Sequence, residues 1–253
     1  MLVDFLIAGV IKAGTTTLFD HLKTHKSTSA PINNLKEVHF FDNDIHFQND
    51  VNYDIYHNHF NQNDKGKLYF ESTPAYLWWY NTPKRIWEYN KDMKFIISLR
   101  NPIYRAHSHW RFNLNNRHCL QFGTPNFLKD IEEEHKRSKG MLPEQYRQVS
   151  FTDMGYYSDQ LRRLWYFFPK DQTLIIRFED IINKPLKTLS KVTSFLDIEP
   201  FNIVDDIKSN VTKDKSKLTY REWEVLRDIF VYEIKELERI LDWDCSDWLT
   251  WDE

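Results

Sequence analysis

Apolar and polar residues alternate along this chain in blocks typical of short buried strands separated by amphipathic helices. The predicted strands cover residues 5–11, 68–71, 94–99 and 173–177. Helices are predicted from about residue 15 to 26, over 83–89, from 102 to about 111, over 155–168, from 185 to 196 and from 219 to 241. This order predicts an α/β fold: a doubly wound parallel sheet flanked by helices, in a single domain that spans residues 1–253. Ligands of such sheets bind at the carboxyl ends of the strands.

The first predicted strand ends in a turn that favours phosphate binding. Glycine lets the backbone approach an anion closely, and the first N–H groups of the following helix point toward it. A lysine and three threonine hydroxyls add donors. The candidate residues for this anion site are Lys12, Ala13, Gly14, Thr15, Thr16 and Thr17. A strand-to-helix turn without a ligand is the alternative.

This loop is P-loop-like but differs from the loop of nucleoside-triphosphate-binding proteins, G-x-x-x-x-G-K-[ST]. Gly9 and Gly14 have the required spacing, but Thr15 occupies the lysine position. Lys12 instead precedes Gly14 by two residues. We therefore expect the cation to lie over the inner part of a short 5′-phosphate tail.

A second candidate anion site follows the predicted strand at residues 94–99. Asn101 is a favourable N-cap and Pro102 a favourable first helical residue, so a helix is predicted to begin there. Arg100 at the strand end and Ser108 two turns into the helix can face one oxyanion, the arginine through a bidentate fork. The alternative is an arginine paired with a neighbouring acid and a serine without a role.

Two further segments carry candidate chemistry. Glu37 and His39 lie two apart in an extended segment, which places two proton-transferring side chains on one side. A surface strand with outward charges is the alternative. In residues 208–217, a solvated charged loop is the default interpretation, and Lys213 and Lys215 are candidates for a lid over a second phosphate. The charged run at 132–137 predicts a solvated helix.

Composition narrows the class of protein. The formal net charge is −3 and the isoelectric point about 6.4. These values argue against a nucleic-acid-binding protein, because such proteins carry an excess of positive surface charge. Two cysteines are too few for a disulfide framework or a structural zinc site, and the histidines show no metal-ligand spacing. The chain has no apolar run of about 18 residues, and its apolar first segment reads as a strand. We expect a cytoplasmic protein with no metal, nucleic-acid or membrane partner.

Two anion sites on separate strand ends suit a nucleotide phosphorylated at two positions. Here the chain resembles the sulfotransferases that use 3′-phosphoadenosine 5′-phosphosulfate (PAPS), and it is most similar to the heparan sulfate sulfotransferase branch. The resemblance covers most of the chain, and its order of motifs is specific. The motifs are Lys12-Ala13-Gly14-Thr15-Thr16, Glu37-Val38-His39-Phe40-Phe41-Asp42, Thr73-Pro74-Ala75-Tyr76, Arg100-Asn101-Pro102 with Arg105 and Ser108, Gly155-Tyr156 and Phe167-Phe168-Pro169.

The resemblance implies a sulfotransferase domain over residues 1–253 with PAPS as donor and no metal. Lys12 would stabilise the charge on the leaving 5′-phosphate, and Glu37 would take the proton from the acceptor, with His39 as the other candidate base. Arg100, Arg105 and Ser108 would hold the 3′-phosphate. The acceptor would be a hydroxyl or amine of a small molecule or carbohydrate. Whether the sulfated atom is an oxygen or a nitrogen stays open.

One departure from the family bears on the acceptor. Related enzymes often have a lysine just before the Thr/Ser-Pro segment, where this chain has Ser72. With the acidic isoelectric point, this favours a prokaryotic enzyme acting on a small metabolite or neutral glycan. A P-loop-type nucleotide or metabolite kinase is the main alternative; the displaced lysine and the lack of an obvious magnesium-binding aspartate disfavour it. A non-catalytic nucleotide-binding protein is disfavoured by the presence of both Lys12 and Glu37.

Overall fold

The computed structural model describes residues 1–115, 124–137, 149–201 and 217–251. The chain divides into two compact units. The first contains Met1–Leu99 and the described residues of Gln160–Asn210, and the second contains Arg100–Asp159 and the described residues of Val211–Glu253. Each unit is described by itself below. The prediction that residues 1–253 form one functional domain stays a prediction.

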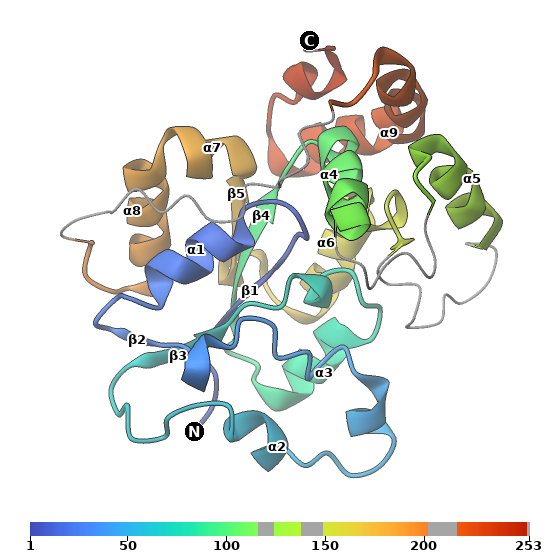
Figure 1. Cartoon of the computed structure of the whole chain (residues 1–253). Helices are drawn as coiled ribbons and strands as arrows, with labels where there is room; N and C mark the ends of the chain where they lie inside the picture. Colours follow the sequence, from blue (N-terminus) through green and yellow to red (C-terminus); the bar gives the residue numbers. More distant parts are fainter. Residues whose placement is uncertain (116–123, 138–148, 202–216, 252–253) are drawn as a thin grey trace. The chain divides into compact units, whose positions relative to one another are not determined.

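The first unit is built on a parallel sheet in the order β2-β3-β1-β4-β5, which confirms the predicted α/β fold (Figure 1). The strands of this sheet are β1 (Phe5–Gly9), β2 (Thr28–Ser29), β3 (Leu68–Glu71), β4 (Lys94–Leu99) and β5 (Thr173–Arg177). Each neighbouring pair is parallel. The two-residue β2 was not predicted, because so short a strand has no periodicity of its own. Since the strands are parallel, the loops after β1, β3, β4 and β5 emerge at one edge.

Helices cover both faces of this sheet because successive strand residues point to opposite sides. Helices α1 (Thr15–Leu22), α7 (Phe178–Asn183) and α8 (Pro185–Leu196) pack on the face that carries Phe5 and Ile7. On the other face, Phe95 packs edge-on against Phe168, which follows α6 (Tyr157–Phe167), with ring centroids 4.7 Å apart. Helix α3 (Thr82–Tyr89) precedes β4. The short elements of this unit are η1 (Ile32–Asn34), η2 (Asp44–Phe47), α2 (Asp54–His57), η3 (Pro74–Tyr76) and η7 (Lys170–Gln172).

Helix α1 ends at Leu22, earlier than the predicted end near residue 26. The reason lies in Thr28, whose hydroxyl donates to the Leu22 carbonyl and, at 3.2 Å, to the His25 carbonyl. The Leu22 carbonyl belongs to the last residue of the helix and has no partner within it, whereas His25 lies in the turn that follows. The chain can therefore turn at once and enter β2.

The second unit is helical. It contains α4 (Pro102–Asn115), α5 (Phe127–Arg137), α9 (Tyr220–Leu241) and the short elements η6 (Asp153–Gly155) and η8 (Ser246–Leu249). As predicted, α4 starts at Pro102, and the Asn101 side chain accepts a hydrogen bond from the Ile103 amide at 3.0 Å. The predicted start of α9 is confirmed by a capping box between Thr219 and Glu222.

The prediction of a solvated helix at residues 132–137 is wrong in one respect. Glu134 of α5 is only 1% exposed, because its carboxylate accepts hydrogen bonds from the amides of Thr152 and Asp153 at 2.8–3.0 Å. The burial raises the pKa of this carboxyl to about 7. Glu134 therefore joins α5 to η6.

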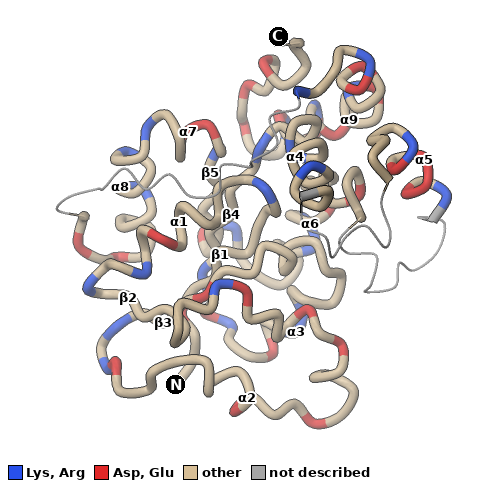
Figure 2. Tube along the Cα trace, viewed as in Figure 1, with Lys and Arg blue, Asp and Glu red and all other residues tan. Residues whose placement is uncertain are grey.

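Charged residues of both signs are interspersed along the described chain, as Figure 2 shows. In the described residues, no helix combines the length and apolar character that crossing a membrane requires.

Candidate functional site

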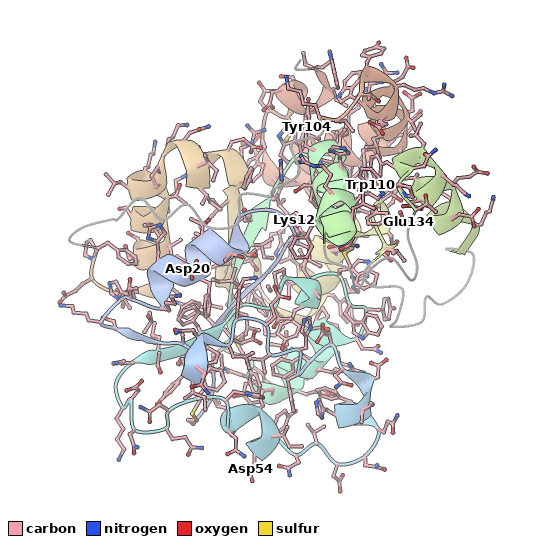
Figure 3. The ribbon with its side chains drawn as sticks, in the orientation of Figure 1. Lys12, Asp20, Asp54, Tyr104, Trp110 and Glu134 are labelled. Atoms are coloured by element: carbon pink, nitrogen blue, oxygen red, sulfur yellow. The ribbon has the colours of Figure 1, made fainter. Side chains whose placement is uncertain are left out.

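The loop between β1 and α1 is held in a defined shape by its own backbone and by β4. The Val10 amide donates to the Ser98 carbonyl at 2.9 Å, and the Ala13 amide donates to the Val10 carbonyl at 3.2 Å. From β4, the buried Ser98 hydroxyl donates to the Ala13 carbonyl at 2.6 Å. Lys12 sits in this loop with a φ of 68°, and Figure 3 labels it there. The Ser98 side chain thus helps to fix the loop conformation, a role that the sequence analysis did not predict.

Gly14 is the N-cap of α1 and has a φ of 79°, a conformation that residues with a Cβ rarely adopt. An added Cβ would lie 3.1 Å from a ring carbon of Phe178. A glycine at this position also has no side chain that could cover the first-turn N–H groups of the helix. A lysine, threonine hydroxyls and the positive end of a helix therefore lie together, and this donor set fits a phosphate or phosphosulfate group.

Glu37 and His39 lie in contact and belong to a larger charged network, although the backbone at His39 is not extended as the sequence predicted but has a φ of 54°. The Glu37 carboxylate is 2.6 Å from the Lys36 ammonium and 3.4 Å from His39 Nε2. On its other side, His39 Nδ1 is 2.8 Å from the Asp42 carboxylate, which is fully buried. The sequence analysis assigned no role to Asp42. An acidic residue three positions after the histidine was the signal that could have indicated this contact.

The network shifts the pKa values of both candidate bases. Burial opposes ionisation of Glu37, but hydrogen bonds from His39 and Lys36 outweigh it and lower the pKa of Glu37 to about 2. Burial likewise opposes protonation of His39, but its bonds to Asp42 and Glu37 raise the pKa of His39 to about 9. At neutral pH, Glu37 is a carboxylate and His39 is a cation. Of the two, only Glu37 can accept a proton in this state.

The segment after β3 holds the backbone of residues 38–41, which lie next to Glu37, in place. The Thr73 hydroxyl accepts from the amides of Val38 and His39 at 3.1 and 3.4 Å and donates to the buried Glu71 carboxylate at 2.6 Å. The Tyr76 hydroxyl accepts from the Phe40 amide at 3.0 Å. The motif at 73–76 thus acts as a support for residues 38–41, because its side chains bond to their backbone.

In the second unit, Arg100 and Ser108 stand at the start and in the second turn of the α4 region, and both are half-buried. The Arg100 carbonyl accepts from the Tyr157 hydroxyl at 3.0 Å. The expectation for Arg105 is corrected: this side chain is fully buried and donates to the Phe151 carbonyl, so it is not accessible to a phosphate. Burial also lowers the pKa of Arg105.

The predicted lid residues Lys213 and Lys215 lie outside the described residues. Within the part of the chain that the structure describes, no group of three or more His, Cys, Asp or Glu side chains could hold a metal ion.

Curated proteins that are similar to this chain include two enzymes named for heparan sulfate. A stretch of 194 residues, 77% of this chain, is 28% identical to mouse heparan sulfate glucosamine 3-O-sulfotransferase 3B1 and covers 46% of that protein. Human bifunctional heparan sulfate N-deacetylase/N-sulfotransferase 2 is 25% identical over 205 residues, which are 79% of this chain and 22% of that protein. The chain therefore spans less than half the length of these two relatives.

Solved structures share the fold. A sulfotransferase from Alicyclobacillus acidocaldarius superposes with a TM-score of 0.80 at 22% identity, over 99% of this chain and 100% of that one. Mouse sulfotransferase SULT7A1, complexed with PAP, superposes with a TM-score of 0.53 at 16% identity, over 94% of this chain and 85% of that one. The family model "Sulfotransferase domain" matches residues 2–232. Because this match spans most of both units, the chain belongs to the sulfotransferase family.

Proposed function

We propose that this protein transfers a sulfuryl group from PAPS to a hydroxyl or amine of a small-molecule or carbohydrate acceptor. The observation that carries the proposal is the β1–α1 loop, in which Lys12 precedes a left-handed glycine N-cap. The family match and the PAP complex of SULT7A1 support the choice of donor. PAPS supplies the activated sulfuryl group when it is bound.

Lys12 and the first turn of α1 hold the 5′-phosphosulfate end in this proposal. As the acceptor oxygen or nitrogen bonds to sulfur and the bond from sulfur to the 5′-phosphate oxygen breaks, negative charge grows on that oxygen. Lys12 stabilises this charge electrostatically. Sulfuryl transfer through a loose transition state depends mainly on such positioning and charge stabilisation, as phosphoryl transfer does.

Glu37 takes the proton that the acceptor loses. A carboxylate with a pKa of about 2 is ionised at any working pH but is a weak base. The pairing with Lys36 contributes to this low pKa. When an acceptor takes the place of Lys36 at Glu37 Oε1, the pKa of Glu37 rises and the residue becomes a better base. His39, held by Asp42, keeps the carboxylate oriented.

Arg100 and Ser108 bind the 3′-phosphate in this proposal, and Lys213 and Lys215 remain predicted lid residues. The relatives named for heparan sulfate support a carbohydrate acceptor, and Ser72 favours an uncharged one. The cytoplasmic location stays a prediction.

Calorimetric titration of the purified chain with adenosine 3′,5′-bisphosphate, and separately with ATP and Mg²⁺, tests the proposal. We expect tight binding of the bisphosphate without metal and weak binding of ATP. Replacement of Arg100 by alanine should weaken binding of the bisphosphate about tenfold or more, because a bidentate charged contact is lost, and should leave adenosine 5′-phosphate unaffected. Preferential binding of ATP with Mg²⁺ would instead support a kinase.

A further inference from the structure

Three consecutive aromatic residues follow η3 at the edge of the sheet where the candidate site lies. Trp78 and Trp79 are half-buried, and Tyr80 is 75% exposed. The turn that carries them is bonded to the end of β1, because the Leu77 amide donates to the Ala8 carbonyl at 3.0 Å. Leu77 also packs on Gly9, where an added Cβ would lie 3.0 Å from it. The aromatic turn therefore begins beside the strand that leads into the phosphate loop.

The same turn is joined to the segment that carries Glu37 and His39. Tyr76, two residues before Trp78, accepts hydrogen bonds from the amides of that segment. Trp79 Nε1 donates to the Asp44 carboxylate at 3.2 Å. The turn is thus bonded both to β1, which leads into the β1–α1 loop with Lys12, and to the segment that carries Glu37.

Arg163 of α6 holds the turn in place. Its guanidinium donates to the carbonyls of Leu77 and Trp78 at 3.2 and 2.8 Å and lies 5.2 Å from the ring centroid of Tyr80. Backbone carbonyls and an aromatic ring together fix a planar guanidinium well. An exposed tyrosine on a firmly held turn loses little conformational entropy when it binds a ligand.

We propose that the Trp78–Tyr80 turn is the acceptor subsite and that it binds an uncharged sugar ring through the face of Tyr80. The apolar C–H face of a sugar ring packs well on an aromatic ring, and the tyrosine hydroxyl can bond to sugar hydroxyls. The inference rests on the proposed sulfuryl transfer and names its acceptor class.

The charges near the turn favour an uncharged acceptor over an anionic one. Lys36 is paired with Glu37, and Arg85 is paired with Asp44 at 2.5 Å. His39 lies between two carboxylates. Because these three cations already face carboxylates in the protein, a sulfated or carboxylated sugar would have to compete for them. The guanidinium of Arg163, a further cation at the turn, already donates to two backbone carbonyls.

Two substitutions of Tyr80 and one matched control test the subsite. Tyr166 is a similar residue, 83% exposed, at the end of α6 that leads toward the amino end of β5 and so to the opposite edge of the sheet. Tyr80→Ala, Tyr80→Phe and Tyr166→Ala are compared with the wild type. The probes are N,N′-diacetylchitobiose as a neutral glycan, a heparan sulfate oligosaccharide as an anionic one and 2-naphthol as a phenol.

Transfer of ³⁵S-labelled sulfuryl from PAPS gives KM and kcat, and tryptophan fluorescence gives acceptor affinity in the presence of adenosine 3′,5′-bisphosphate. For the neutral glycan we expect Tyr80→Ala to raise KM and Kd about tenfold with kcat little changed, since one stacking contact is lost. Tyr80→Phe should recover most of the affinity. Tyr166→Ala should match the wild type.

The inference is overturned if the neutral glycan neither binds nor reacts, if the anionic sugar or the phenol is preferred, or if Tyr80→Ala keeps the wild-type KM. Calorimetry with adenosine 3′,5′-bisphosphate separates these results from failure of the proposed function. A subsite error leaves bisphosphate binding intact in all variants, whereas a wrong donor abolishes it in the wild type as well.

Discussion

The surroundings of His39 change its protonation at neutral pH. It lies between the carboxylates of Glu37 and Asp42, and its backbone amide donates to Thr73. As a cation, it cannot serve as the base at neutral pH. Its role in the proposed mechanism is therefore to orient Glu37, and this division of roles can be tested by titration.

We expect NMR titration of the His39 ring to give a pKa of about 9 in the wild type and a lower value, toward 6.5, in Asp42→Asn, because a buried negative partner is lost. Since folding raises this pKa, the stability that protonated His39 contributes is fully present below pH 6.5 and is lost as the pH rises through 9. An unchanged titration in Asp42→Asn would show that Asp42 does not control His39.

Lys12→Ala should lower kcat for sulfuryl transfer by about 10²–10³-fold, because a single preorganised charge at the leaving oxygen has an effect of that order. Steady-state kinetics with PAPS measure the change. Lys67→Ala is a suitable control, since Lys67 is a partly exposed lysine of the same unit that pairs only loosely with Asp64, at 3.6 Å. Full activity of Lys12→Ala would rule out the proposed role.

At the scale of the element, β1, the following loop and α1 (residues 5–22) form one structural unit. The conformation of its loop is held by Ser98 of β4, which bonds to the loop backbone, and by Phe178 of α7, which packs beside Gly14. The loop conformation thus depends on residues far away in the sequence as well as on its own glycine.

Gly14 and Gly66 allow the effect of backbone conformation to be separated from the effect of crowding by Phe178. Both glycines have a positive φ, 79° and 81°, but of the two only Gly14 has neighbouring atoms close to an added Cβ. Gly66→Ala should destabilise the protein by about 1 kcal/mol, the approximate backbone penalty for a residue with a Cβ in this region. Gly14→Ala should destabilise it more, since the added methyl meets Phe178. Urea unfolding measures both, and equal losses would mean that Phe178 moves aside without penalty.

At the scale of the whole molecule, buried carboxyl groups shape the dependence of stability on pH. Burial raises the pKa of Glu71 to about 7, against partial compensation by hydrogen bonds from Thr73 and Tyr76. The folded protein therefore holds a proton that the unfolded chain releases above pH 4.5. This contribution to stability is present below pH 4.5 and is lost as the pH rises through about 7.

Glu71→Gln removes this titration while it keeps an oxygen that can accept from Thr73. We expect the free energy of unfolding of the wild type to fall relative to that of Glu71→Gln between pH 4.5 and 8, as measured by urea unfolding at several pH values. The exposed Glu88 offers a control, since Glu88→Gln should leave the curve parallel to the wild type. Parallel curves for Glu71→Gln would show that Glu71 is already ionised in the folded state.

Much of the secondary structure could be predicted because its signals are local. The strands at residues 68–71, 94–99 and 173–177, the turn at Gly14 and the Asn101 cap follow from patterns a few residues long. The exceptions have a common cause. The early end of α1, the burial of Glu134 and the burial of Arg105 depend on partners between 6 and 46 positions away, which no local pattern contains.

The sequence by itself determined the α/β class, the turn between β1 and α1 that carries Lys12 and Gly14, and the presence of Glu37 and His39 as possible bases. The tertiary structure supplied the charge network on which the proposal of Glu37 as the base rests. Apolar periodicity and turn residues act over one or two turns of chain, so they are readable from sequence. The protonation of a side chain depends instead on burial and on charges brought close in space. Here the carboxylates of Asp42 and Glu37 outweigh burial and raise the pKa of His39 to about 9, and for this reason the proposed mechanism assigns the proton transfer to Glu37.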